Sequence, residues 1–177
     1  MNTPEWKQIC NFKNSLEQIK MTDYLINISI ILATFISMEC VAWLAHRYIM
    51  HGFGWFLHKD HHEKGTEAFF EKNDFFFLIF ALPGIAGLFF GMRNNFNSLF
   101  WLGLGITIYG AAYFLVHDIF IHQRFKLFRN TDSVYLRAIR KGHKMHHKHL
   151  GKEHGESFGM LWVPMKHFRE ALKLSSK

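Results

Sequence analysis

The sequence predicts an all-α integral membrane protein, with about three to four transmembrane helices and a histidine-rich cap at one membrane surface. Two observations predict this class. Mostly apolar stretches lie at 25–45, 75–92 and 99–116, and a helix of about 18 residues, about 27 Å long, nearly matches the hydrocarbon core of a bilayer. Histidine, in contrast, is concentrated in the polar segments that follow the first and third stretches.

The composition is that of one domain, 1–177, with 49% hydrophobic and 17% aromatic residues. Two cysteines are too few for a disulfide framework or a thiolate metal site. The formal charge of +7 is accompanied by no nucleic-acid-binding motif. We therefore expect no nucleic acid partner, and we expect the positive charge to follow the membrane topology instead.

Residues 1–22 precede the first apolar stretch and form a weak amphipathic pattern. Trp6, Ile9, Leu16 and Ile19 recur at near-helical spacings with lysines between them. This pattern favours a helix on the membrane surface, and a poorly ordered terminus is the alternative.

The stretch 25–45 is the first predicted span and ends directly before His46. It is too long for the apolar region of a cleaved signal peptide. Its one acidic residue, Glu39, lies seven positions before His46 and therefore on nearly the same side of a helix. A carboxylic acid inside a span usually faces the protein interior, so Glu39 is a candidate for supporting a metal ligand or handling protons; an interhelical hydrogen bond is the alternative.

The stretches 75–92 and 99–116 contain no charged residue and are joined by a polar link, 93–98, which predicts a transmembrane hairpin. The hairpin returns the chain to the side from which it left. Thirteen of the twenty-one Lys and Arg follow the hairpin and only Arg93 lies in its link, so the positive-inside tendency places both histidine-bearing regions in the cytoplasm. We expect close helix approach at five glycines: Gly84, Gly87, Gly103, Gly105 and Gly110.

Ten of the thirteen histidines fall into four boxes, two of the form His-x4-His and two of the form His-x-x-His-His. In chain order they are His46 and His51; His58, His61 and His62; His117 and His122; and His143, His146 and His147. A lone histidine is usually a packed or surface residue, but two copies of the same paired spacing predict metal ligation. We expect His149, His154 and His167, which lie outside the boxes, to be surface residues.

On a helix, the three histidines of a His-x-x-His-His box fall within an arc of about 100° and share one face. The two histidines of a His-x4-His box are about 140° apart on a straight helix and do not. Gly52, directly after His51, indicates that the helix frays or ends there, whereas His122 has no such glycine and needs a bulge or a helix end. A first-row ion takes about four to six ligands, so ten converging imidazoles predict two metal ions.

The ligand set favours redox chemistry on iron. The chain contains no Glu-x-x-His motif, which excludes the carboxylate-bridged di-iron sites of four-helix bundles. Imidazole suits iron, which supplies the redox change that zinc lacks, and a centre at the membrane surface reaches lipid-soluble substrates. We therefore expect O2-dependent oxidation of an unactivated C–H bond. A non-enzymatic membrane metal-binding or transport protein is the alternative, although Glu39 is the only charged residue available within the spans for an ion pathway.

The order of the four boxes around a transmembrane hairpin resembles the fatty acid hydroxylase superfamily. Three further stretches narrow the resemblance to the bacterial β-carotene 3-hydroxylases, over about residues 25–165: Glu71-Lys72-Asn73-Asp74, His117-Asp118 through His122-Gln123-Arg124, and Lys152-Glu153 with Ser157-Phe158-Gly159. The resemblance implies a membrane hydroxylase, expected in a bacterial inner membrane, that hydroxylates C3 of the β-ionone rings of β-carotene and β-cryptoxanthin to give zeaxanthin.

The resemblance also implies a non-haem di-iron monooxygenase that consumes O2 and two electrons per hydroxylation, delivered by ferredoxin and its reductase. The ten box histidines match the iron ligands of the family, and Asp118 fits a role in orienting an adjacent imidazole. His154 and the long stretch before residue 22 depart from the family pattern. Another branch of the superfamily, a carotenoid ketolase or a lipid or sterol hydroxylase, is the alternative with the same boxes.

Overall fold

Every regular element of the computed structural model is a helix, over the residues that the structure describes: 5–63, 70–128 and 130–175, with side chains for 20–63, 70–128 and 130–174. In order these are α1 (Glu5–Leu44), η1 (Ala45–Phe53), α2 (Trp55–His62), α3 (Asp74–Arg93), α4 (Ser98–Tyr113), η2 (Phe114–Ile121), α5 (Val134–His146) and α6 (Met165–Ser175), where η marks a π-helix. Three helical stretches are long and apolar enough to cross a membrane: Lys20–Phe53, Asp74–Arg93 and Ser98–Ile121. The predicted all-α fold with three spans is confirmed.

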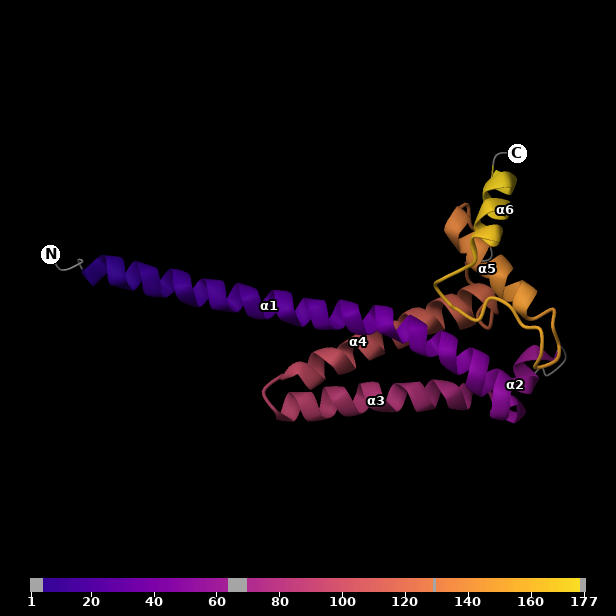
Figure 1. Ribbon diagram of the computed structural model, residues 1–177, viewed down its shortest axis with the longest axis horizontal. Coiled ribbons are helices and arrows are strands. Elements are labelled where there is room, and N and C mark those ends of the chain that lie inside the picture. Colours follow the sequence, from indigo (N-terminus) through magenta and orange to yellow (C-terminus); the bar gives the residue numbers. More distant parts are fainter. Residues whose placement is uncertain (1–4, 64–69, 129, 176–177) are drawn as a thin grey trace.

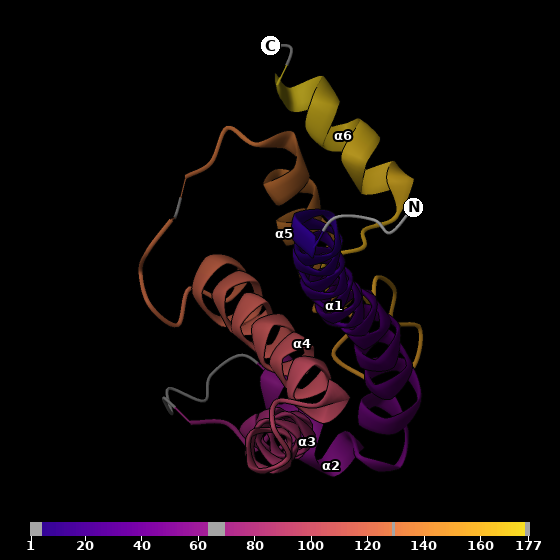
Figure 2. The same cartoon turned by 90° about the vertical axis from the view of Figure 1, so that its left-hand side faces the viewer.

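The three long helices form a bundle with a cap at one end. The α3–α4 hairpin lies along the second half of α1, and α2, α5 and α6 gather where α1 and α4 finish (Figure 1). Figure 2 shows the long helices nearly end on, and α4 packs against both α1 and α3. The hairpin therefore returns the chain to the end of the bundle from which it left, as its polar link predicts.

The outer surface of the bundle is apolar, as a lipid-facing surface must be. Large side chains such as Ile36 on α1 and Leu82 on α3 are 66% and 63% exposed. In the cap, by contrast, a small apolar core joins η2 to α5 and the C-terminal segment, with Phe120, Ile139 and Met160 at its centre. Exposed apolar area on this scale indicates lipid contact over the bundle, while the cap packs like a soluble protein.

Small residues let the long helices approach closely. A Cβ added to Gly87 would lie 2.9 Å from the Cα of Gly103, and one on Gly91 would lie 2.3 Å from the backbone nitrogen of Phe100. On the other face of α4, a Cβ on Gly105 would lie 2.7 Å from Thr34 of α1. Packing through small residues is the usual way for membrane helices to associate. It confirms the expectation for Gly87, Gly103 and Gly105, and Gly91 is a further close approach that was not predicted.

The first span is part of a longer helix than the sequence indicates. The stretch 25–45 lies within α1, which begins at Glu5 and continues into η1 without ending before the first histidine box. The predicted interfacial segment, 1–22, falls mostly on residues whose side chains, or whole placement, lie outside the described part of the chain. A surface location for that segment therefore stays a prediction.

Candidate metal centre

The two His-x4-His boxes are built on the π-helices η1 and η2. On a straight α-helix the two histidines of such a box would be about 140° apart, whereas the wider turn of a π-helix brings them to the same side. The backbone nitrogen of His122 donates to the carbonyl of His117 at 2.9 Å, five residues earlier. In such i→i+5 bonding, residue i+5 lies above residue i, as residue i+4 does in an α-helix. The expectation of a helix end at His51 is partly right, because Gly52 has non-helical angles (φ −105°, ψ −122°) inside η1. The helix end expected at His122 is present, because η2 ends at Ile121 with His122 as its C-cap, in a π-turn.

The two His-x-x-His-His boxes lie on short helices of the cap. The first occupies α2, where His58, His61 and His62 are all buried. The second ends α5, where His146 is fully buried and His147 is the C-cap. The α5 helix is capped by Ser133, directly before Val134, and the Ser133 hydroxyl accepts a hydrogen bond from the backbone nitrogen of Leu136 (3.4 Å). The apolar face of this helix packs into the cap core, so its histidines turn toward those of α2.

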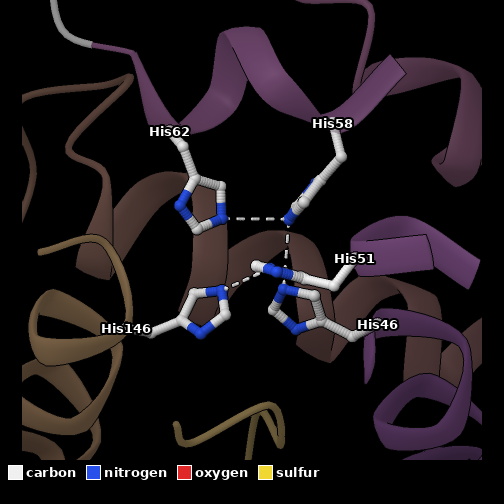
Figure 3. Close-up of side chains that lie close together, drawn as sticks. All are labelled: His46, His51, His58, His62 and His146. Atoms are coloured by element: carbon white, nitrogen blue, oxygen red, sulfur yellow. Dashed lines mark hydrogen bonds between the residues drawn. The ribbon is translucent and has the colours of Figure 1, made fainter. Parts of the chain in front are cut away.

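Nine of the ten box histidines gather into two groups, in each of which one nitrogen per ring lies within 4.8 Å of the others. The first group, shown in Figure 3, comprises His46, His51, His58, His62 and His146. We call it the strap-side group because most of its rings face residues 149–158. The carboxylate-side group comprises His61, His117, His122 and His143. His147, the tenth, lies between the groups: its ring centroid is 4.5 Å from that of His62, and its Nε2 is 2.9 Å from the Nε2 of His143.

Within each group the Nε2 atoms face one another. In the strap-side group the Nε2 of His58 lies 3.1 Å from that of His46 and 3.2 Å from that of His62. In the carboxylate-side group the Nε2 atoms of His122 and His143 are 2.8 Å apart. Around an ion with metal–nitrogen bonds of about 2.0–2.1 Å, neighbouring ligand atoms lie roughly 2.8–3.4 Å apart, so these separations fit a coordination shell.

The Nδ1 atoms of the strap-side group fix the protonation of its rings. Four of them face backbone carbonyls of residues 149–158, a segment that we call the strap: His62 faces the carbonyl of His149 (3.0 Å), His51 that of Lys152 (2.9 Å), His146 that of Glu156 (2.9 Å) and His46 that of Phe158 (3.0 Å). A carbonyl only accepts hydrogen bonds, so each Nδ1 carries the proton and donates it. Each Nε2 therefore carries a lone pair, and these lone pairs point toward one another. Because they repel, a cation bound between them stabilises the arrangement.

The fifth strap-side ring, that of His58, donates from Nδ1 to the side-chain oxygen of Asn73 (2.7 Å). All five strap-side histidines therefore have a neutral acceptor. Asn73 lies in the stretch 71–74, where the sequence carries a family resemblance, but its contact with His58 was not predicted. A polar residue just before an apolar span is the signal that could have pointed to it.

Carboxylates support the other group. The Nδ1 of His61 lies 2.6 Å from Glu71, and Arg124 binds Asp74 at 3.0 Å while lying 3.6 Å from Glu71. Asp118, the predicted orienting residue, is buried and lies 3.5 Å from the Nδ1 of His117, which is too long for a strong hydrogen bond. Glu71 was missed as a supporting residue, because nothing in its local sequence indicates the fold that brings it to His61.

Glu39 forms hydrogen bonds with backbone and tyrosine groups and not with a box histidine. One carboxylate oxygen accepts from the backbone nitrogens of Met160, Leu161 and Trp162 at 2.8, 2.8 and 2.9 Å, and the other accepts from the Tyr109 hydroxyl at 2.8 Å. None of these partners is a box histidine. The contacts favour the interhelical alternative, extended to the chain just after the strap.

Burial favours the neutral form of His58 and His62. It lowers the pKa of His58 to about 3 and that of His62 to about 4. Neutral imidazoles are the form that binds metal, so the site is ready for a cation at ordinary pH. Burial also raises the pKa of the Glu71 carboxyl to about 7, which makes its hydrogen bond with His61 sensitive to any positive charge held nearby.

The histidines outside the boxes divide into two kinds. His149 and His154 are exposed, as predicted. His167 is only 3% exposed, so the prediction of a surface position is wrong for it. Its ring packs between α6 and α5, next to Gly142 and 3.4 Å from the Ser157 hydroxyl, because the amphipathic α6 buries this side of the helix against α5.

An apolar cavity of about 440 Å³ leads from the spans to the metal groups. Its walls come from α1, α3 and α4 and include Phe77, Phe80 and Ile106. At the cap end the lining changes to polar residues, among them His117 and Asp118. A lipid-soluble molecule held between the helices would therefore meet the carboxylate-side group.

Comparisons with known proteins agree with this site. The model of the fatty acid hydroxylase family matches residues 31–165, a range that contains all four boxes. A β-carotene hydroxylase of Pantoea ananas is 43% identical over 78% of this chain and 78% of its own length. A β-carotene hydroxylase of a Paracoccus species is 39% identical over 88% of this chain and 93% of its own length.

A plant relative extends the similarity to a longer protein. The chloroplastic β-carotene 3-hydroxylase 1 of Arabidopsis thaliana is 35% identical over 83% of this chain, which covers 47% of the plant protein. No solved structure matches the chain. The family match over most of the chain, and bacterial relatives aligned over most of their own length, lead to one conclusion: the chain belongs to the fatty acid hydroxylase family of membrane oxygenases.

Proposed function

We propose that this protein is a β-carotene 3-hydroxylase, which converts β-carotene to β-cryptoxanthin and then to zeaxanthin. The observation that carries the proposal is the apolar cavity that runs between the spans and ends at His117. A carotene dissolves in the bilayer, and this cavity connects the bilayer region with the histidine groups. The names of the bacterial and plant relatives support the same substrate.

The ten box histidines are proposed to hold two iron ions, in line with the family and with the separation of the rings into two groups. Bound iron would supply the activation of O2 that this hydroxylation requires. In each hydroxylation one oxygen atom enters the C–H bond, the other leaves as water, and two electrons and two protons are consumed. The chain contributes neutral imidazoles with fixed Nδ1 protons, and an apolar cavity that excludes bulk water from the β-ionone ring of the substrate.

The orientation and the electron donor are also proposals. The excess of Lys and Arg after the hairpin supports a cytoplasmic cap, and the membrane we propose is a bacterial inner membrane. Reduced ferredoxin, regenerated by its reductase, would deliver the electrons. Lys144, Lys148 and Lys152 are exposed and lie in the chain around the last histidine box and the strap. Positive charge there would favour binding of an acidic electron-donor protein.

The proposal is tested by expressing the protein in cells that accumulate β-carotene and by separating their pigments by chromatography. We expect monohydroxylated and dihydroxylated carotenoids with the wild-type chain, and only β-carotene with His146→Ala. Keto products would identify the ketolase branch instead. Unchanged β-carotene, despite folded and iron-loaded protein, would favour the lipid or sterol hydroxylase alternative.

A further inference from the structure

Gly110, near the end of α4, differs from the other hairpin glycines in its surroundings. A Cβ placed on it would meet no heavy atom of another element within 4 Å, whereas one on Gly87, Gly103 or Gly105 would lie 2.9 Å or less from a neighbouring helix. The expectation that Gly110 allows close helix approach is therefore wrong. Packing requires those three glycines, but it does not require this one.

The backbone does not require glycine at this position either. Gly110 lies inside a regular helix and does not have a left-handed φ. Glycine is a poorer helix former than alanine in water, so helix propensity does not explain this glycine either. What the missing side chain leaves at Gly110 is open space.

That space belongs to the apolar cavity, which Gly110 lines together with Ile106 and Phe114 of the same chain segment. His117 lies seven residues further along, which is about 10 Å in the direction of the cap. A molecule that extends from the span region of the cavity to His117 must therefore lie against Gly110. Any side chain there would narrow the cavity between its apolar part and the histidines.

We infer that Gly110 is a specificity-determining residue that leaves the cavity wide enough for the cyclic end group of a carotene to reach the metal groups. The inference rests on the proposed function for the identity of the substrate. A β-ionone ring, with its three methyl substituents, is wider than the flat polyene that follows it. A side chain at position 110 would therefore exclude the ring before it excluded an open chain.

The test is a graded series, Gly110→Ala, Gly110→Leu and Gly110→Phe, with Ala86→Phe as the matched control. Ala86 is an exposed residue of α3 outside the cavity lining, so a phenylalanine there adds the same ring on the lipid-facing surface. Binding of β-carotene and of the acyclic carotene lycopene is measured on purified protein by quenching of tryptophan fluorescence. Metal content and thermal unfolding are measured on the same samples, and pigments are analysed in cells.

We expect β-carotene binding to weaken by at least tenfold in Gly110→Phe and by less in Gly110→Ala, while lycopene binding changes less than threefold. Metal content and unfolding temperature should equal or exceed those of the wild type in Gly110→Ala, and Ala86→Phe should match the wild type throughout. Equal loss of both carotenes, no loss of either, or loss of metal across the whole series would overturn the inference. A wild-type chain that binds β-carotene but does not hydroxylate it would refute the proposed function and leave this inference standing.

Discussion

The two histidine groups differ in what holds their rings. All five strap-side imidazoles donate from Nδ1 to neutral acceptors, four of which are backbone carbonyls of the strap. In the carboxylate-side group, His61 contacts Glu71 and His117 lies near Asp118. A carboxylate acceptor makes an imidazole a stronger donor to metal than a carbonyl does. We therefore expect the two bound ions to be chemically distinct.

The difference has a second consequence, because the two kinds of support respond differently to mutation. Backbone carbonyls do not change when a side chain is replaced, so the strap-side group depends on the position of the strap. The carboxylate-side group depends instead on individual side chains.

The largest effect is expected from loss of a ring in either group. Mutation of a residue that only hydrogen-bonds to a metal ligand typically lowers metal affinity or activity by about 10–100-fold, so removal of a ligand itself should lower them further. His61→Ala and His146→Ala should each lower carotene hydroxylation by more than about a hundredfold, as measured by product formation and bound metal. His154→Ala, at an exposed position, is the matched control; an active His146→Ala enzyme would exclude the last box from the site.

Glu71→Gln tests the contrast between the groups directly. The amide keeps the size of the side chain but removes the charge that faces His61, so we expect about 10–100-fold weaker binding of one of the two ions. Chelator titration should resolve one weakened and one unchanged ion, and Mössbauer spectra of the iron protein should show one altered site. Lys152→Ala is the control, since only its backbone carbonyl contacts a ring. Equal weakening of both ions would show that the groups are not independent.

Glu39→Ala should act on the strap-side group from a distance. It leaves three backbone nitrogens and the Tyr109 hydroxyl without their acceptor, so we expect the free energy of unfolding to fall by about 1–3 kcal/mol. Movement of the strap should then weaken the strap-side ion more than the other. Thermal unfolding with and without metal measures both effects. Glu39→Gln, which retains one accepting oxygen, should recover part of the stability; wild-type behaviour in Glu39→Ala would mean that the strap is held by other contacts.

A pH dependence is expected of the metal-free protein. The pKa values of His58 and His62 are about 3 and about 4 in the folded chain, below the ordinary value of 6.5. Between these values and pH 6.5 the unfolded chain binds protons that the folded chain does not, so the free energy of unfolding should fall as the pH drops below about 6.5. Thermal unfolding at pH 8, 7, 6 and 5 measures this decline. A midpoint that stays constant over this range would contradict neutral burial of these rings.

The spans were predictable because apolar length alone determines which segments enter a bilayer, and 75–92 and 99–116 lie within α3 and within α4 with η2. The His-x-x-His-His boxes were predictable as shared faces, because their spacing matches an ordinary helix. Both His-x4-His boxes were harder, since the sequence does not indicate that the chain adopts a π-turn.

The sequence by itself therefore determined the fold class, the hairpin and the ten histidines, because hydropathy and residue spacing are local properties of the chain. Only the tertiary structure decided how these histidines divide into two groups, which of them face the strap, and that His61 faces Glu71. It also decided that Glu39 binds the chain after the strap, that His167 is buried and that Gly110 faces open space. These features depend on contacts between segments about 10 to more than 100 residues apart, and such contacts follow from how the helices pack.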